Sequence, residues 1–286
     1  MKTIIYVLIA VFTFGIIAHS FKSQSRINNS ILIQSTDKMI SSETLSQSAK
    51  IISARLNSFS PGTFKLKAIS EIQQIQVIST DNSDFRTVES LLTQKGFFAF
   101  YATYNQKQLS DLLKGDNRLF SLLNAKNSTH LSAEIGYTTV AGVNKVNDYL
   151  RSLALNQQCK FAWSQSDEDH EVCLYALRLE STKGAILTGA DIDNFKCVQG
   201  KSSENNVIAI EFKKPAVAIW ADATKRNINN AIAIVLDDQV LMAPIIKSVI
   251  EGGKCEIGGK FTQTEAQCMA ALGNNGELPV SFNIVR

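Results

Sequence analysis

Residues 229–286 read NNAIAIVLDDQVLMAPIIKSVIEGGKCEIGGKFTQTEAQCMAALGNNGELPVSFNIVR, and this stretch decides the fold. Its apolar runs and turn residues predict a strand at 231–236, an Asp-Asp turn, a Pro-containing segment and a Gly-Gly turn. An Ala-rich helix follows the Gly-Gly-Lys-Phe-Thr sequence, and Gly-Glu-Leu-Pro-Val leads into a last strand at 278–285. This mixture of strands and helices indicates an α+β fold.

The N-terminal part of the chain predicts the order β-α-β-β-α-β. A helix opens at Ser41-Ser42-Glu43 and runs to Leu56, and a second helix at 84–95 ends at Gly96. The predicted strands lie at 31–34, 63–68, 72–79 and 96–104. This order is the ferredoxin-like plan. We therefore assign residues 28–105 to a base subdomain that the final strand, within 277–286, completes.

Two further segments lie between the two parts of the base. Residues 106–182 contain a polar helix, a second helix at 143–155 and a β-hairpin of 159–165 with 171–179, and we treat them as an insertion. Residues 183–276 form an α+β head subdomain, in which Pro215 starts a helix at 215–227. The head is thus expected to be inserted inside the base.

Several motifs resemble the first periplasmic domain of SecD and fused SecDF, membrane proteins that assist protein export. The head contains Trp220-Ala221, Thr224 and Ala-Ile-Val-Leu-Asp at 233–237, which match the family's order. In the base, Arg55 ends the first helix where the family has an Arg. Four strings within 106–182 (Phe-Ser-Leu-Leu, Val-Asn-Lys-Val-Asn-Asp-Tyr-Leu, Phe-Ala-Trp-Ser and Leu-Tyr-Ala-Leu) resemble an insertion of fused SecDF from Bacteroidetes-type bacteria.

The N-terminus carries an export or membrane signal. Lys2 precedes an apolar run at 4–18, which fits a signal-peptide core better than a full span of about 20 residues. If the apolar run is extended to Phe21, it could instead form a short membrane anchor. Residues 1–21 are therefore either a signal peptide or an N-terminal membrane anchor. In both cases we expect a periplasmic protein, tethered to the inner membrane by residues 4–21 if they are not cleaved.

Composition and motifs argue against several function classes. With 45% hydrophobic residues, 19% charged residues and a net charge of +3, the chain has an ordinary globular composition without the basic stripe of a nucleic-acid-binding protein. The segment 254–260 lacks the Gly and Ser/Thr of a phosphate loop. His170 and Cys173 are three residues apart, which on a strand points them to opposite faces and disfavours a metal site. We expect no enzyme activity, cofactor or metal.

The five cysteines invite disulfides in an exported protein, although the odd number leaves at least one unpaired within the chain. Cys197 with Cys255 is a candidate pair. Direct bridging of Cys159 and Cys173 would need a register shift in their hairpin, which otherwise pairs Cys159 with Ala176. The alternative, that all five are small buried thiols, remains open.

An apolar run after the Asp-Asp turn is the candidate binding site. Val240, Leu241, Met242 and Ile245 form either an inner strand of the core or a groove for unfolded polypeptide, and both interpretations stay open. Flexible Met and aliphatic side chains suit promiscuous binding.

The resemblance implies a non-enzymatic accessory periplasmic protein that binds exported polypeptide or the Sec translocon. The sequence ends at Arg286, where the family continues into transmembrane helices, so we expect a domain that does not itself couple a proton gradient to translocation. The alternative is a repurposed SecD-like domain, acting as an envelope binding or structural protein without an export role.

Overall fold

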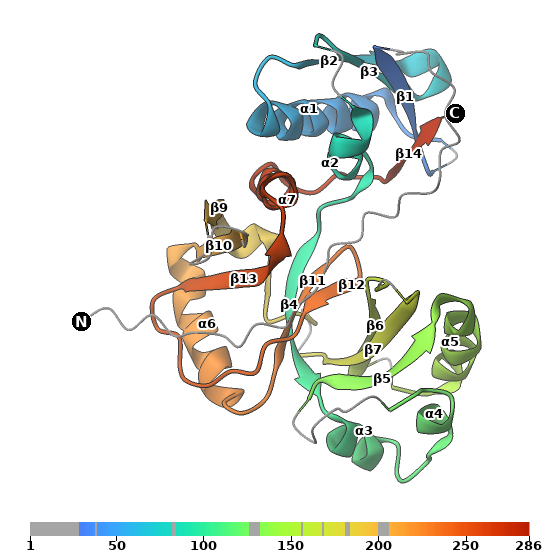
Figure 1. The fold of residues 1–286 in the computed structure, drawn as a ribbon, viewed down its shortest axis with the longest axis vertical. Coiled ribbons are helices and arrows are strands. Elements are labelled where there is room, and N and C mark those ends of the chain that lie inside the picture. Colours follow the sequence, from blue (N-terminus) through green and yellow to red (C-terminus); the bar gives the residue numbers. More distant parts are fainter. Residues whose placement is uncertain are drawn as a thin grey trace. The chain divides into compact units, whose positions relative to one another are not determined.

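The computed structural model describes residues 29–37, 39–81, 84–125, 132–155, 157–167, 169–180, 184–199 and 206–285. The chain forms two compact units, whose elements are labelled in Figure 1. Unit 1 comprises Phe98–Ile192 and Ile210–Lys260, and unit 2 comprises residues 29–97, Asp193–Ala209 and 261–285. The predicted signal or anchor at 1–21 lies outside the described residues. Among those residues, no helix is long and apolar enough to cross a membrane.

Unit 2 is built on an antiparallel sheet of four strands in the order β14-β1-β3-β2. Alternation along β3 buries Ile75 and Val77 and turns Gln74 and Gln76 to the other face, as the period of two requires. The helix α1 packs on the buried face, where Leu45, Ile52 and Leu56 are its core residues. The elements of this unit are β1 (Ser30–Ser35), α1 (Ser42–Phe59), β2 (Phe64–Ile69), β3 (Gln74–Ser79), α2 (Glu89–Thr93), α7 (Gln263–Asn274) and β14 (Phe282–Val285).

The α+β class and the β-α-β-β-α-β order of the base are confirmed, but with a different last strand. The strand predicted at 96–104 is β4 (Phe98–Tyr104), which pairs with β11, β7 and β8 in unit 1. β14 instead completes the base sheet beside β1, as expected for the C-terminal strand. Residues 98–103 are all buried, which requires cover on both faces of the sheet.

Arg55, at the C-terminal end of α1, is fully buried and joins three segments of unit 2. Its guanidinium donates hydrogen bonds to the carbonyl oxygens of Gln94 (2.7 Å), Lys95 (2.7 Å) and Gly276 (2.6 Å), which follow the C-termini of α2 and α7. The negative ends of two helix dipoles thus face the buried cation. Gly96, with φ of +82°, has no room for a Cβ, because that atom would lie 2.4 Å from Arg55 Nη2.

Unit 1 contains a sheet of seven strands in the order β5-β7-β6-β12-β11-β4-β8. Strands from both predicted segments, 106–182 and 183–276, pair within it, and the boundary between insertion and head stays a prediction. Leu109, Leu119 and Val146 bring the helices α3, α4 and α5 onto β5 and β7 through one core. The elements are β4, α3 (Gln106–Leu112), α4 (Arg118–Ser121), β5 (Glu134–Thr139), α5 (Val143–Ser152), β6 (Cys159–Ser164), β7 (Glu171–Arg178), β8 (Leu187–Thr188), α6 (Lys214–Arg226), β11 (Ile232–Leu236) and β12 (Gln239–Met242).

The remaining strands form a three-stranded sheet in the order β13-β10-β9. They are β9 (Ile192–Gln199), β10 (Asn206–Phe212) and β13 (Lys254–Phe261). The helix α7, which we had assigned to the head, packs against α1 and α2 within unit 2. Its buried face, with Ala266, Met269 and Leu272, is apolar enough to serve as part of that core.

Candidate polypeptide-binding surface

The hairpin of β11 and β12 positions the predicted binding residues. Asp237 and Asp238, which connect the two strands, have φ of 50° and 67°. Two successive residues with positive φ are typical of the two-residue turn that matches the twist of a hairpin, and Asp tolerates this conformation better than most residues. The predicted Asp-Asp turn is therefore confirmed. It brings β12 between β11 and β6 in the sheet of unit 1.

The structure divides the four predicted binding residues into two pairs. Val240 and Met242 are buried, with 1% and 6% of their surface exposed, so they belong to the core. Leu241 and Ile245 are half-buried and reach the surface. A partner on this surface would contact the second pair, and the role of these residues in binding polypeptide stays a prediction.

The segment after β12 is fixed beside α6. The Ile246 N–H donates to the Asn230 carbonyl (2.9 Å), and the Asn229 N–H donates to the Ile246 carbonyl (2.8 Å). Further along, the Ile250 N–H donates to Oγ1 of Thr224, a buried residue of α6 (3.0 Å). Backbone and side-chain bonds thus hold this stretch, although it contains few strand residues, and they fix the place of Ile245.

Sequence reasoning missed one accessible side chain in this region. Ile228, which follows the α6 cap Asn227, is 38% exposed and forms a backbone bridge with Ile246. Its neighbours in the sequence, Asn227, Asn229 and Asn230, are polar, and an isolated apolar residue in such a stretch is a signal of surface position. We call the three accessible apolar residues Ile228, Leu241 and Ile245 the apolar surface of unit 1, and that they form one continuous patch is a prediction.

Three aromatic rings attach α6 to the strands of unit 1. Trp220 of α6 lies 5.5 Å from Phe100 of β4 and 5.0 Å from Phe212 of β10, measured between ring centroids. The two Phe rings are 5.3 Å apart at 71°, which is an edge-to-face arrangement. All three are buried, so the cluster supports the helix whose C-terminal end carries Ile228.

Arg226, at that end of α6, is paired with two carboxylates. It donates two hydrogen bonds to the Glu180 carboxylate (3.1 and 3.0 Å) and one to Asp222 (2.9 Å). The Glu180 bond, followed by the Asp222 bond, raises the pKa of Arg226. These exposed pairs add little stability. Lys225, the other basic residue of the last turn, adds a positive charge three residues before Ile228.

All five cysteines are free thiols in the structure. Cys197 and Cys255 lie on β9 and β13, the strands on either side of β10. The pairing of these two cysteines stays a prediction. Cys159 pairs with Arg178 rather than with Ala176, and Cys159 and Cys173 are buried.

Stability should fall at alkaline pH because of these buried thiols. Burial raises the pKa of Cys159 and of Cys173 to about 12, whereas an unfolded thiol has a pKa of about 8.5. The folded protein therefore holds protons that the unfolded chain releases. Its free energy of unfolding should decrease above about pH 8.5, by up to about 1.4 kcal/mol per pH unit for each thiol.

Urea unfolding at a series of pH values measures this effect. The variant Cys173→Ala should show a shallower loss of stability than the wild type between about pH 9 and 10, and an unchanged slope below pH 8. Parallel slopes for the two proteins in the alkaline range would contradict the assignment of Cys173 as a protonated buried thiol.

Comparison with known families shows what part of the chain is similar to. Residues 167–280 match the family model described as SecDF, P1 head subdomain. This segment of the chain is therefore similar to the P1 head of SecDF. The matched range includes β11, β12 and the whole apolar surface of unit 1. The resemblance to SecD and SecDF is thereby confirmed, while the Bacteroidetes-type origin of the insertion stays a prediction, and the SecD homologues imply a periplasmic location.

The SecD relatives are much longer than the part that aligns. The protein translocase subunit SecD of Acidaminococcus fermentans is 36% identical over 100 residues, which cover 35% of this chain and 24% of the relative. The subunit of Mycobacterium tuberculosis is 37% identical over 101 residues, covering 34% of this chain and 18% of the relative. The chain thus spans about a quarter or less of these SecD proteins.

Solved SecDF structures share the fold of this domain. One chain of SecDF, a membrane component that enhances protein export, superposes with a TM-score of 0.53 over 90% of this chain and 98% of its own length, at 19% identity. SecDF in a super-membrane-facing form gives a TM-score of 0.54 over 90% of this chain and 29% of its own, at 18% identity. The likeness in fold therefore covers most of this chain, beyond the range that matches the P1 head model.

Proposed function

We propose that this domain is a non-enzymatic accessory of protein export that binds exported polypeptide, or the Sec translocon, through the apolar surface of unit 1. The observation that carries the proposal is the match of residues 167–280 to the SecDF P1 head, a range that contains this surface. The similarity to SecD subunits supports an accessory role in export. It also favours the absence of catalysis, as for a translocase accessory subunit.

The chemistry of the surface suits a partner of variable sequence. Ile228, Leu241 and Ile245 offer aliphatic side chains, whose contacts depend on apolar area and not on hydrogen-bond geometry. Arg226 is balanced by its carboxylates. Binding by apolar area with few directed polar contacts tolerates many sequences, as unfolded exported chains require.

Photocrosslinking in cells from position 241 tests the proposal. With benzoylphenylalanine in place of Leu241, we expect adducts with nascent exported proteins or Sec subunits, identified by mass spectrometry. The matched control carries the probe at Gln239, an exposed residue of the same strand, and should give fewer of these adducts. Adducts with a single unrelated envelope protein would favour the repurposed domain, and equal adducts from both positions would show that the apolar surface is not the binding site.

A further inference from the structure

One edge of the unit 2 sheet is open. Among the described residues, β2 pairs with β3 alone and is the last strand in the order β14-β1-β3-β2. The Thr80 N–H donates to the Thr63 carbonyl (2.8 Å), which makes these two residues a hydrogen-bonded pair. Because such pairs alternate along an antiparallel ladder, Phe64, Leu66 and Ala68 direct their N–H and C=O groups away from β3. The free edge therefore offers a row of backbone donors and acceptors.

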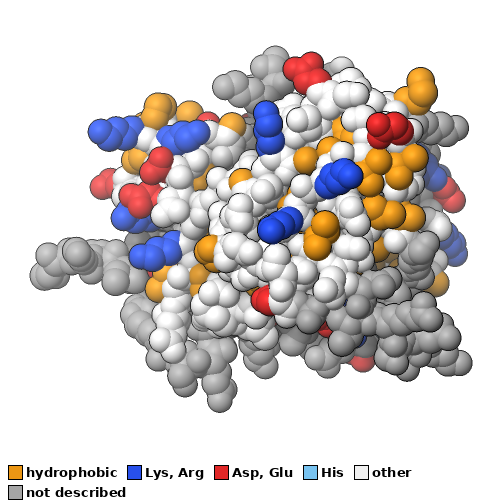
Figure 2. Space-filling model, turned by 90° about the horizontal axis from the view of Figure 1, so that it is seen from above, with side chains coloured by type: hydrophobic (Ala, Val, Ile, Leu, Met, Phe, Trp, Pro, Cys, Tyr) orange, Lys and Arg blue, Asp and Glu red, His pale blue; other side chains and the backbone are white. Residues whose placement is uncertain are grey.

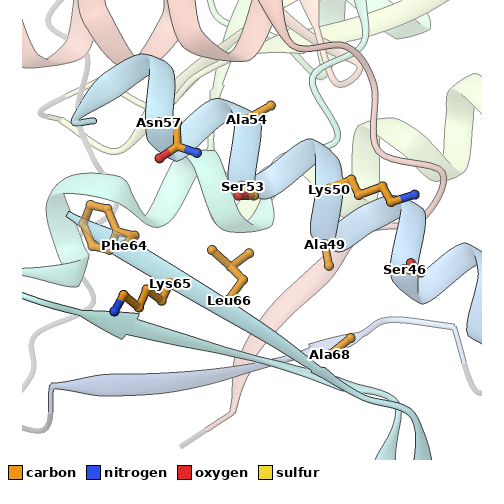
Figure 3. Close-up of a pocket in the computed structure, with 10 residues that line it drawn as sticks. All are labelled: Ser46, Ala49, Lys50, Ser53, Ala54, Asn57, Phe64, Lys65, Leu66 and Ala68. Atoms are coloured by element: carbon orange, nitrogen blue, oxygen red, sulfur yellow. The ribbon is translucent and has the colours of Figure 1, made fainter. Parts of the chain in front are cut away.

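A groove of about 780 Å³ runs between this edge and α1. Its helical side is a single face of α1, in which Ala49, Ser53 and Ala54 leave room because their side chains are small. Figure 3 shows Ala49 pointing from α1 toward β2 and Leu66 pointing from β2 toward α1. A strand added beside β2 would therefore place every second side chain over small and aliphatic groups.

The groove and its edge are basic. Lys50 of α1 and Lys65 of β2 are among the ten lining residues, none of which is acidic. Lys67 lies two residues after Lys65 on the same strand and is also exposed. Figure 2, seen from above the view of Figure 1, shows a face on which single Lys or Arg side chains, Asp or Glu side chains and hydrophobic groups are scattered among other side chains and backbone.

The Lys side chains of the groove favour some binding partners of the open β2 edge over others. A second copy pairing through its own β2 would bring Lys65 and Lys67 of both chains together, and like charges across strands are destabilising. The chain's own residues 22–28 contain Lys22 and Arg26 and no acid, so they do not complement the groove either. An acidic segment of another protein does.

We propose that β2 accepts an extended acidic segment of a partner protein as a fifth strand. Apolar side chains on one face of this segment pack into the groove against Leu66 and α1. Acidic side chains on its other face lie opposite Lys65 and Lys67, and main-chain hydrogen bonds to Phe64, Leu66 and Ala68 provide affinity. This site is separate from the apolar surface of unit 1, and the inference does not rest on the proposed export function.

An isotope-labelled sample of the protein and two synthetic peptides test the proposal. An eight-residue peptide in which Glu alternates with Val should bind and slow the hydrogen exchange of the Phe64, Leu66 and Ala68 amides. The amides of Lys65 and Lys67, already directed to β3, should change little. The matching peptide of alternating Lys and Val should bind at least about tenfold more weakly, because its charges oppose those of the groove.

Two variants separate the edge contacts from the charges. Ala68→Pro removes one outward N–H while leaving the ladder to β3 in place, and should weaken the Glu peptide at least about fivefold. Lys65→Glu with Lys67→Glu should reverse the preference between the two peptides, whereas Lys107→Glu, on α3 of unit 1, should not. Absence of binding, exchange changes that map away from β2, or an unchanged preference in the double variant would each overturn the proposal.

Discussion

Replacing Arg55 by Met is expected to destabilise unit 2 by about 3–5 kcal/mol. The variant keeps an apolar stem but donates no hydrogen bond to the carbonyls of Gln94, Lys95 and Gly276, which now accept bonds of 2.6 to 2.7 Å. A buried acceptor that loses its donor costs about 1–3 kcal/mol. Urea unfolding combined with hydrogen exchange read by mass spectrometry should show the loss in peptides from α1, α2 and α7.

Two further variants test whether the loss of stability comes from the hydrogen bonds of the Arg55 guanidinium. Arg55→Lys keeps the charge but replaces a planar fork of donors with a single ammonium, so it should retain only part of the stability. Lys50→Met, an exposed site on the same helix, should change the free energy of unfolding by no more than about 0.5 kcal/mol. If Arg55→Met lost less than about 1 kcal/mol, the carbonyl contacts would not be what holds the three segments together.

The local structure of the base could be predicted because its signals are local. Ser41 accepts the Thr44 N–H at 3.0 Å and starts α1 where the sequence indicated. The choice of sheet for β4 could not be predicted in the same way. An apolar run shows that a strand is buried, but its partners β8 and β11 come from segments about 90 and 130 residues further along the chain.

The candidate sites likewise depend partly on local sequence, which can be read directly, and partly on contacts between distant segments, which cannot. Burial alternates along β12, with Val240 and Met242 inside and Leu241 half-buried, but the continuous apolar run does not reveal from the sequence which of these residues face the core. Arg55 was noted as a family match, yet its role depends on the carbonyl of Gly276, 221 residues away. The edge of β2 became a candidate site only when the order of strands was known.

Replacing Trp220 by Ala is expected to destabilise unit 1 by about 3–5 kcal/mol. The indole is 3% exposed and packs against both Phe100 and Phe212, so its removal leaves a cavity beside two rings that are held on separate strands. The same loss should loosen the C-terminal end of α6 and lower crosslinking from position 241. Hydrogen exchange in peptides of α6 and β4 measures the change.

Trp220→Phe distinguishes the contribution of aromatic packing to stability from the cost of the buried indole N–H. The Trp220 Nε1–H is buried and has no hydrogen-bond partner among the described residues. Phe removes this costly donor while keeping most aromatic contacts, so the net loss should stay below about 1.5 kcal/mol. Guanidinium unfolding of both variants gives the comparison. Equal losses for Ala and Phe would contradict the prediction, because they would mean that the aromatic contacts kept by Phe do not stabilise unit 1.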